Sequence, residues 1–241
     1  MPSAADSDRL IADLLADPGY TSGRRAYPRT ITLPDALGVI GRLFAEVDRG
    51  VAARADMARA GGVTIACRRG CNACCAEPIL VLLPTALAVA TWLAQPDRAE
   101  ARAAFLAAYP VWRAAVGDTL DQLSDLAAGG AREEQAAAHL AHQRRGLLCP
   151  FNHGGDCTIY PVRPVVCRNG HAVDSADYCG GDHPSGKAAT RLAFVPLDDF
   201  LKRVRRVEQA LHLAIGGGAL RHVALPDLVH ALLARVGAAA S

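Results

Sequence analysis

The nine residues Cys67-Arg68-Arg69-Gly70-Cys71-Asn72-Ala73-Cys74-Cys75 hold half of the eight cysteines in this chain. A thiolate is a strong, soft metal ligand, and four thiols placed this close together favour a metal site. Independent cysteines that merely fill a core as small apolar side chains would not gather in this way. The rest of the chain is therefore best understood as what completes, carries or uses this site.

The backbone of this stretch cannot be one straight helix if all four thiols bind one ion. At a rise of about 1.5 Å per residue, a helix would separate Cys67 from Cys75 by roughly 12 Å. The segment therefore either turns at Gly70, or its thiols serve a polynuclear cluster or two sites. The adjacent residues Cys74 and Cys75 are expected to point in different directions and to have different roles.

A second group of cysteines begins about seventy residues further along the chain. Glycines and prolines between its members, such as Gly154 and Pro161, predict an irregular, turn-rich segment. A loop of this kind is expected to bury little apolar surface. It is therefore expected to need an internal crosslink to be stable, and a bound metal supplies one. By analogy with zinc-finger peptides, the metal would contribute on the order of 10 kcal/mol to local folding. All eight cysteines are candidate ligands, in one polynuclear site or two four-ligand sites: Cys67, Cys71, Cys74, Cys75, Cys149, Cys157, Cys167 and Cys179.

Two arginines beside the second group are candidate partners of the metal ligands. Four thiolates around Zn2+ or a [4Fe–4S]2+ core leave a charge of about −2, which is costly to bury without compensation. We expect Arg163 and Arg168 to donate hydrogen bonds to sulfur or to loop carbonyls. The other nearby arginines are expected at the solvated surface: Arg68, Arg69, Arg144 and Arg145.

Four histidines lie near the cysteines, and each is expected to have another role than metal ligation. His153 and His171 could replace a cysteine as ligand but are more typical of loop histidines. His139 and His142 are spaced i, i+3 on an expected helix, where a surface or core pair is the stronger reading.

Apolar periodicity and proline or glycine boundaries predict a mostly α-helical protein. With 51% hydrophobic but only 5% aromatic residues, close helix packing is favoured over a sheet sandwich. The expected helices span 3–17, 34–60, 84–95, 97–127, 131–145, 195–215 and 226–236. We expect a single helical domain over 1–241 that frames a loop-rich cysteine metal-binding core. That core spans about 63–180, between N-terminal helices (3–60) and C-terminal helices (192–237).

Charge and hydropathy favour a cytoplasmic protein whose thiols stay reduced. No basic segment followed by an apolar run opens the chain, and no apolar stretch approaches the roughly 20 residues of a membrane span. Disulfides conflict with this compartment. The net charge of +2 argues against nucleic acid as a partner, although the arginines keep that reading open.

The two cysteine groups together resemble the YkgJ-like cysteine-cluster family, the CxxCxxCC zinc- or iron-chelating domain. The resemblance covers about residues 63–180. Its motifs are the first cysteine group, Cys149-Pro150-Phe151, Cys157-Thr158-Ile159-Tyr160 and Arg163-Pro164-Val165-Val166-Cys167-Arg168. In one departure, three residues rather than two separate Cys67 from Cys71. The resemblance implies chelation of zinc or iron. A similar cysteine cluster occurs in the flagellin lysine-N-methylases, and this likeness is the main indication that the chain could be an enzyme.

Two function classes follow from these observations. In the first, zinc or iron holds together a binding module that recognises an unidentified protein or small molecule. In the second, the chain is an iron–sulfur enzyme or electron-transfer protein, of a methylase-like, protein-modifying kind. A redox dithiol at Cys71 and Cys74 lacks the surrounding βαβ pattern. No phosphate loop, Rossmann fingerprint or serine-hydrolase elbow is present, and the sequence identifies no catalytic residue.

Overall fold

Helices dominate the described part of the chain, which confirms the predicted fold class. The computed structural model describes residues 31–68, 70–127, 129–169, 171–180, 191–192, 197–216 and 218–239. The α-helices are α3 (Leu33–Ala60), α4 (Leu83–Leu93), α5 (Ala99–Leu126), α6 (Arg132–Gln143), α7 (Val165–Arg168), α8 (Leu197–Ala214) and α9 (Leu225–Ala239). Apart from the short α7, these ranges agree with the predicted helices to within a few residues. The helix predicted at 3–17 lies outside the described residues.

Local signals set the ends of α3. Pro34 occupies the first turn, where the missing N–H of proline costs nothing. The side chain of Thr32 accepts a hydrogen bond of 3.3 Å from the backbone N–H of Asp35, which satisfies a donor left unpaired at the helix start. Gly61 caps the other end. These are the residues from which the sequence predicts the helix, because capping depends only on near neighbours.

Short 3-10 helices and paired strands fill the segments between the helices. The 3-10 helices are η1 (Ala73–Ala76), η2 (Pro96–Arg98), η3 (Tyr160–Val162) and η4 (Ala176–Gly180). Three antiparallel pairs join β1 (Leu80–Val81) with β6 (Val223–Ala224), β2 (Asn152–His153) with β3 (Asp156–Cys157), and β4 (His171–Ala172) with β5 (Arg191–Leu192). The β1–β6 pair ties the segment after the first cysteine group to the start of α9.

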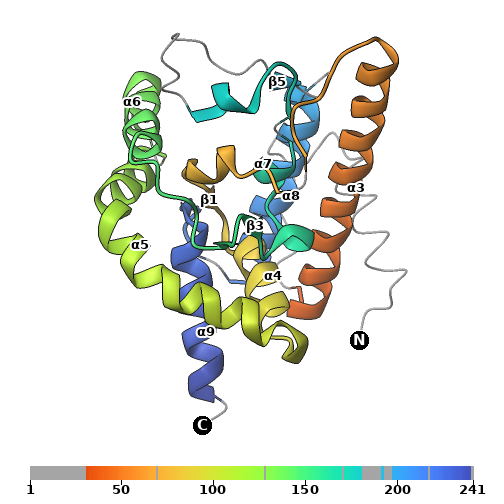
Figure 1. Ribbon diagram of the computed structural model, residues 1–241. Helices are drawn as coiled ribbons and strands as arrows, with labels where there is room; N and C mark the ends of the chain where they lie inside the picture. Colours follow the sequence, from red (N-terminus) through yellow and green to blue (C-terminus); the bar gives the residue numbers. More distant parts are fainter. Residues whose placement is uncertain are drawn as a thin grey trace.

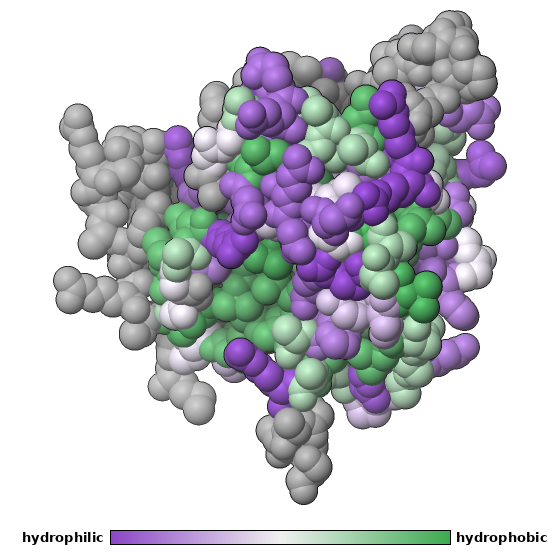
Figure 2. All heavy atoms as spheres, turned by 90° about the vertical axis from the view of Figure 1, so that its left-hand side faces the viewer, coloured by the Kyte–Doolittle hydropathy of each residue, from purple (hydrophilic) through white to green (hydrophobic). Residues whose placement is uncertain are grey.

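The cysteine segments lie between two groups of helices. In Figure 1, α3 stands on one side and α5 with α6 on the other, and the segments that carry the cysteines run between them. The face of α5 and α6 shows a recessed apolar area bordered by hydrophilic side chains (Figure 2). No helix among the described residues combines the length and apolar character that crossing a membrane requires.

The second cysteine segment is anchored in two of the hydrophobic cores. One core lies between α3 and α8 and includes Val165 of α7. The other lies among α4, α5 and α9 and includes Phe151 and Ile159. Phe151 is 1% exposed and stacks on Phe105 of α5, with ring centroids 4.3 Å apart. The expectation that this loop buries little apolar surface is therefore wrong, because apolar side chains between its cysteines insert into the helices. Burying Phe151 alone is worth on the order of 2 kcal/mol.

Candidate metal centre

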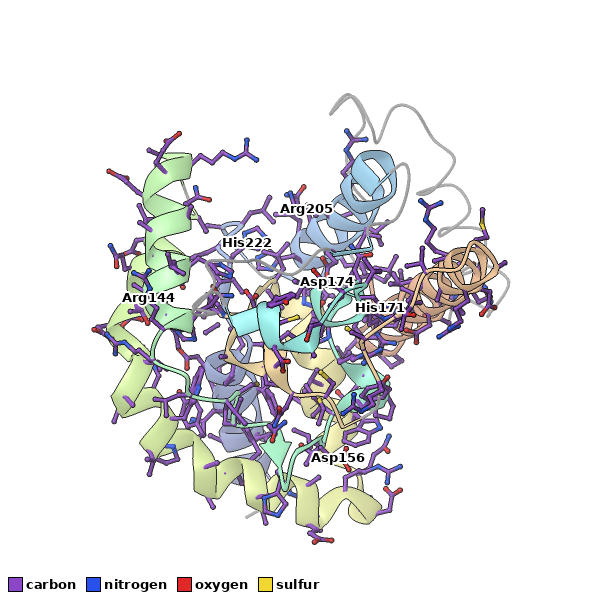
Figure 3. The ribbon with its side chains drawn as sticks, turned by 45° about the horizontal axis from the view of Figure 1, so that its top comes forward. Arg144, Asp156, His171, Asp174, Arg205 and His222 are labelled. Atoms are coloured by element: carbon purple, nitrogen blue, oxygen red, sulfur yellow. The ribbon has the colours of Figure 1, made fainter. Side chains whose placement is uncertain are left out.

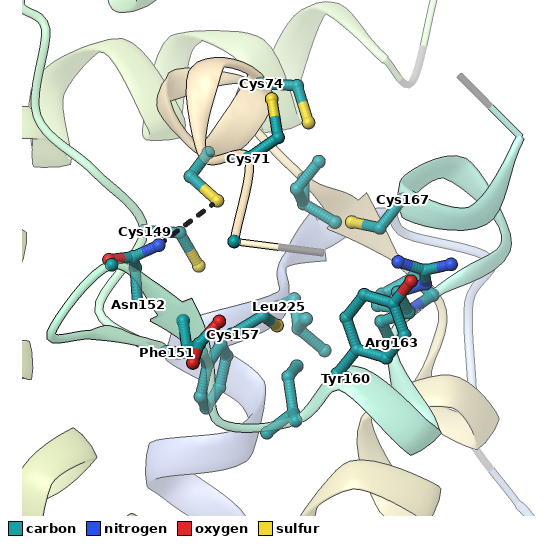
Figure 4. Close-up of a pocket in the computed structure, with 17 residues that line it drawn as sticks. Cys71, Cys74, Cys149, Phe151, Asn152, Cys157, Tyr160, Arg163, Cys167 and Leu225 are labelled. Carbon is teal, nitrogen blue, oxygen red and sulfur yellow. Dashed lines mark hydrogen bonds between the residues drawn. The ribbon is translucent and has the colours of Figure 1, made fainter. Parts of the chain in front are cut away.

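Six of the eight predicted cysteine ligands line one pocket, three from each cysteine group (Figure 4). The pocket has a cavity volume of about 100 Å³. Its cysteines are Cys71, Cys74, Cys75, Cys149, Cys157 and Cys167. Thiols that are far apart in the sequence thus face a common space between the helices.

A turn at Gly70 starts the first half of the pocket. Gly70 has a φ of +82°, in the left-handed region that favours glycine. The backbone N–H of Cys71 donates a hydrogen bond of 3.0 Å to the carbonyl of Arg68, which closes the turn. The segment therefore does turn at Gly70 and is not one straight helix. The turn redirects the chain so that Cys71 faces the pocket.

The 3-10 helix η1 presents the next two thiols from consecutive positions. Cys74 and Cys75 both line the pocket, and the Cys75 sulfur faces Asn152. Cys74 is the exposed one of the pair, and Cys75 is half-buried. The two thiols thus share one space but differ in their access to solvent.

Hydrogen bonds join the two cysteine groups directly. The backbone N–H of Cys149 donates to the carbonyl of Cys75 at 2.7 Å. The side-chain amide of Asn152 donates to the sulfur of Cys75 at 3.6 Å, the dashed contact in Figure 4. Asn152 stands opposite Cys157 in the β2–β3 hairpin, whose turn contains Gly154 and Gly155 with φ of +61° and +90°. The hairpin therefore sets the distance between the second group's first two thiols.

Burial favours the protonated form of four of the six pocket thiols. It raises the pKa of the thiols of Cys75, Cys149, Cys157 and Cys167. A nucleophilic or redox-active cysteine needs the opposite, a lowered pKa. A bound metal cation deprotonates the thiols that coordinate it and compensates their charge. A set of neutral, soft donors around one space therefore fits a thiophilic metal better than a thiol catalyst.

Arg163 supplies positive charge at the pocket. Its guanidinium carbon lies 3.8 Å from the centroid of the Tyr160 ring, and both side chains line the pocket. The charge of Arg163 favours the thiolate of Cys157 and so opposes the effect of burial on that pKa. The Nε of Arg163 is buried without a hydrogen-bond partner within the described chain.

Arg168 holds the loop rather than lining the pocket. It is 2% exposed and donates hydrogen bonds of 2.7 Å to the carbonyls of Arg163 and Pro161. It also pairs with Asp48 of α3, and its guanidinium lies 4.5 Å from the centroid of the Phe44 ring. Arg168 therefore fastens the backbone of Pro161 and Arg163 to α3, next to Cys167.

Cys67 and Cys179 are not among the residues that line the pocket. The sulfur of Cys67 accepts a hydrogen bond of 3.1 Å from the backbone N–H of Ala172, and the N–H of Ala66 donates to the carbonyl of Ala172 at 2.8 Å. Cys179 is buried on η4, which packs on η1. Metal ligation by these two cysteines stays a prediction.

The four histidines also lie outside the pocket lining. His142 is buried, and its Nδ1 lies 2.9 Å from the hydroxyl of Thr119. That hydroxyl donates to the carbonyl of Val116, so Nδ1 carries the proton and donates to Thr119. His139 pairs with Glu77. Arg144, at the end of α6, was not predicted as a partner of the metal ligands. In Figure 3 it lies well away from Asp156, which lines the pocket, and from His171.

The pocket thiols are spread rather than gathered around one point. Within the described ranges, no three His, Cys, Asp or Glu side chains are grouped so that they could hold one metal ion. Figure 4 shows the sulfurs distributed around an open space.

Sequence reasoning does not identify Asn152 or Asp156, which also line the pocket. The available signal is their position, between Cys149 and Cys157 in a turn-rich segment. Comparison with known proteins adds no relative, because no family model, curated protein or solved structure matches this chain. Similarity to the YkgJ-like family thus rests on the motifs alone.

Proposed function

We propose that this protein chelates zinc or iron through the thiols of the six-cysteine pocket. The observation that carries the proposal is the convergence of three cysteines from each group on one pocket. The hydrogen bond from Cys149 to Cys75 and the contact of Asn152 with the Cys75 sulfur support the same conclusion.

The chain's own residues divide the work at this site. Pocket cysteines would hold the metal, and Asn152 would orient the Cys75 sulfur through its amide. Arg163 would offset the excess negative charge, as its effect on the pKa of Cys157 indicates. Zinc would supply a structural crosslink there, whereas iron would add one-electron chemistry. A reducing compartment such as the cytoplasm is part of the proposal, because the thiols must stay reduced.

Metal analysis of matched cysteine variants tests the proposal. The full chain is purified anaerobically, and its zinc and iron are measured per chain. We expect Cys149→Ala and Cys157→Ala to lose most of the metal. The matched controls Cys67→Ala and Cys179→Ala, outside the pocket, should retain it. Circular dichroism verifies that each variant is folded. Full metal retention by folded pocket variants would overturn the proposal.

An iron–sulfur enzyme or electron-transfer protein is the second candidate. The six pocket thiols, two more than one structural zinc ion uses, favour it over a module that holds one zinc ion. A brown anaerobic preparation whose visible absorption is bleached by dithionite would support this candidate. A colourless preparation with stoichiometric zinc would support the module. A methylase-like activity rests on the resemblance alone, and the partner protein or small molecule is unassigned.

A further inference from the structure

The pocket offers more thiols than one metal ion can use. This inference rests on the proposed function and concerns how many ions the site takes. A single zinc ion in a structural site binds four ligands, in tetrahedral geometry. Six cysteines line the pocket, so a mononuclear centre would leave two of them without a metal to bind.

The arrangement of the sulfurs also disfavours a single ion. With metal–sulfur bonds of about 2.3 Å, tetrahedral ligands lie about 3.8 Å from one another. The pocket sulfurs instead surround a cavity of about 100 Å³, several times the roughly 10–15 Å³ that one water molecule needs.

The walls of the pocket resist collapse onto one ion. Phe151, 1% exposed against α5, fixes the segment between Cys149 and Cys157. Arg168 ties the backbone before Cys167 to α3. Drawing these thiols together around one centre would break packing and hydrogen bonds on opposite sides of the pocket.

We propose that the pocket binds a polynuclear metal centre, in which two or more ions share the six thiols. Two kinds of centre fit, and in both of them sulfur atoms bridge the metal ions. The bridging sulfur would be that of cysteine in a zinc–thiolate centre, or inorganic sulfide in an iron–sulfur cluster.

Native mass spectrometry of the full chain, with metal and acid-labile sulfide analysis, tests the stoichiometry. We expect two or more ions per chain in anaerobically purified protein. Iron with sulfide identifies the iron–sulfur cluster, and zinc without sulfide identifies the zinc–thiolate centre. If the protein is purified without metal, it is reconstituted with zinc, or with iron and sulfide, before the measurement.

The double variant Cys67→Ala/Cys179→Ala separates one shared centre from two distant sites. We expect it to keep the full number of ions, and loss of one ion would overturn the inference. If this variant is unfolded, cobalt-loaded wild type replaces it. Ions that share sulfur couple magnetically and give a weaker paramagnetic resonance signal than two isolated ions, whereas a full signal overturns the inference.

One ion per chain that depends on the pocket cysteines would leave the proposed function standing and refute the polynuclear centre. Failure to bind any metal after reconstitution would refute both.

Discussion

The backbone N–H of Cys149 donates a hydrogen bond of 2.7 Å to the carbonyl oxygen of Cys75. This contact joins the last cysteine of the first group to the first cysteine of the second. A backbone bond does not depend on the protonation of either thiol, so it joins the two groups whatever the charge of the thiols. Single contacts around the pocket can therefore be tested one at a time.

The amide of Asn152 is predicted to tune the metal site through the sulfur of Cys75. Asn152→Ala removes the 3.6 Å contact and should weaken metal affinity about 10-fold, within the range for residues that support metal ligands. Competition with a chelator of known affinity measures the change. His153→Ala is the control, because His153 is the exposed neighbour in the same strand. Equal affinities for both variants would show that the amide has no influence.

The charge of Arg163 is predicted to matter more than its packing. Arg163→Leu should reduce metal affinity about 10-fold, because the excess negative charge of the thiolates loses a nearby cation. Arg163→Lys keeps the charge and should recover most of the affinity, although it loses the flat contact with Tyr160. Chelator competition provides the measurement. Similar affinity for the leucine variant and the wild type would contradict this role.

The turn at Gly70 is predicted to set the position of Cys71. Gly70→Ala places a side chain at a φ of +82° and should cost about 1–2 kcal/mol of stability. Metal affinity should fall as well, since the strain is relieved by moving Cys71. Gly129→Ala is the control, because the added methyl group meets nothing within 4 Å there. Urea denaturation measures the loss of stability, and chelator competition measures the loss of metal affinity. A Gly70 variant as stable as the control would show that this turn does not require glycine.

Stability below neutral pH is predicted to depend on His142. Burial lowers the pKa of His142 to about 4, from the ordinary value of 6.5. Between these values the unfolded chain binds a proton that the folded chain does not, so stability falls as the pH drops from about 6.5 towards 4. The loss is bounded at about 3 kcal/mol.

Comparison of the wild type with His142→Gln isolates this contribution. Denaturation curves at several pH values should show a smaller loss of stability for the variant across this window, because glutamine does not titrate. Other groups titrate equally in both proteins and cancel in the difference. Parallel curves for the two proteins would mean that His142 does not carry the effect.

Removal of the metal is predicted to loosen the cysteine segments without unfolding the helices. Phe151, Ile159 and Val165 anchor the second segment in the cores whether or not a metal is present. After treatment with a chelator, the helical circular dichroism signal should be largely retained, while amide hydrogen exchange should rise around 70–76. Loss of the helical signal on chelation would show that the metal holds the whole domain, as the zinc-finger analogy predicts.

Features that depend on neighbouring residues could be predicted from this sequence, whereas contacts between residues distant in the chain could not. The ends of α3 were predictable, because Pro34 and Gly61 act on their own neighbours. Clustering of cysteines was enough to predict that thiols of the two groups meet, but it left one site or two sites open. Stacking of Phe151 on Phe105 was not predictable, because it joins residues that are distant in the chain. The separation of Cys67 from the pocket also depends on a distant partner, the backbone of Ala172.

The exposure of Cys74 has a consequence for the order in which the protein matures. The scaffold of helices can form first, and Cys74 then offers the most accessible thiol to an arriving ion. Loading would proceed from this sulfur inwards to the thiols that burial keeps protonated, with each step releasing a proton.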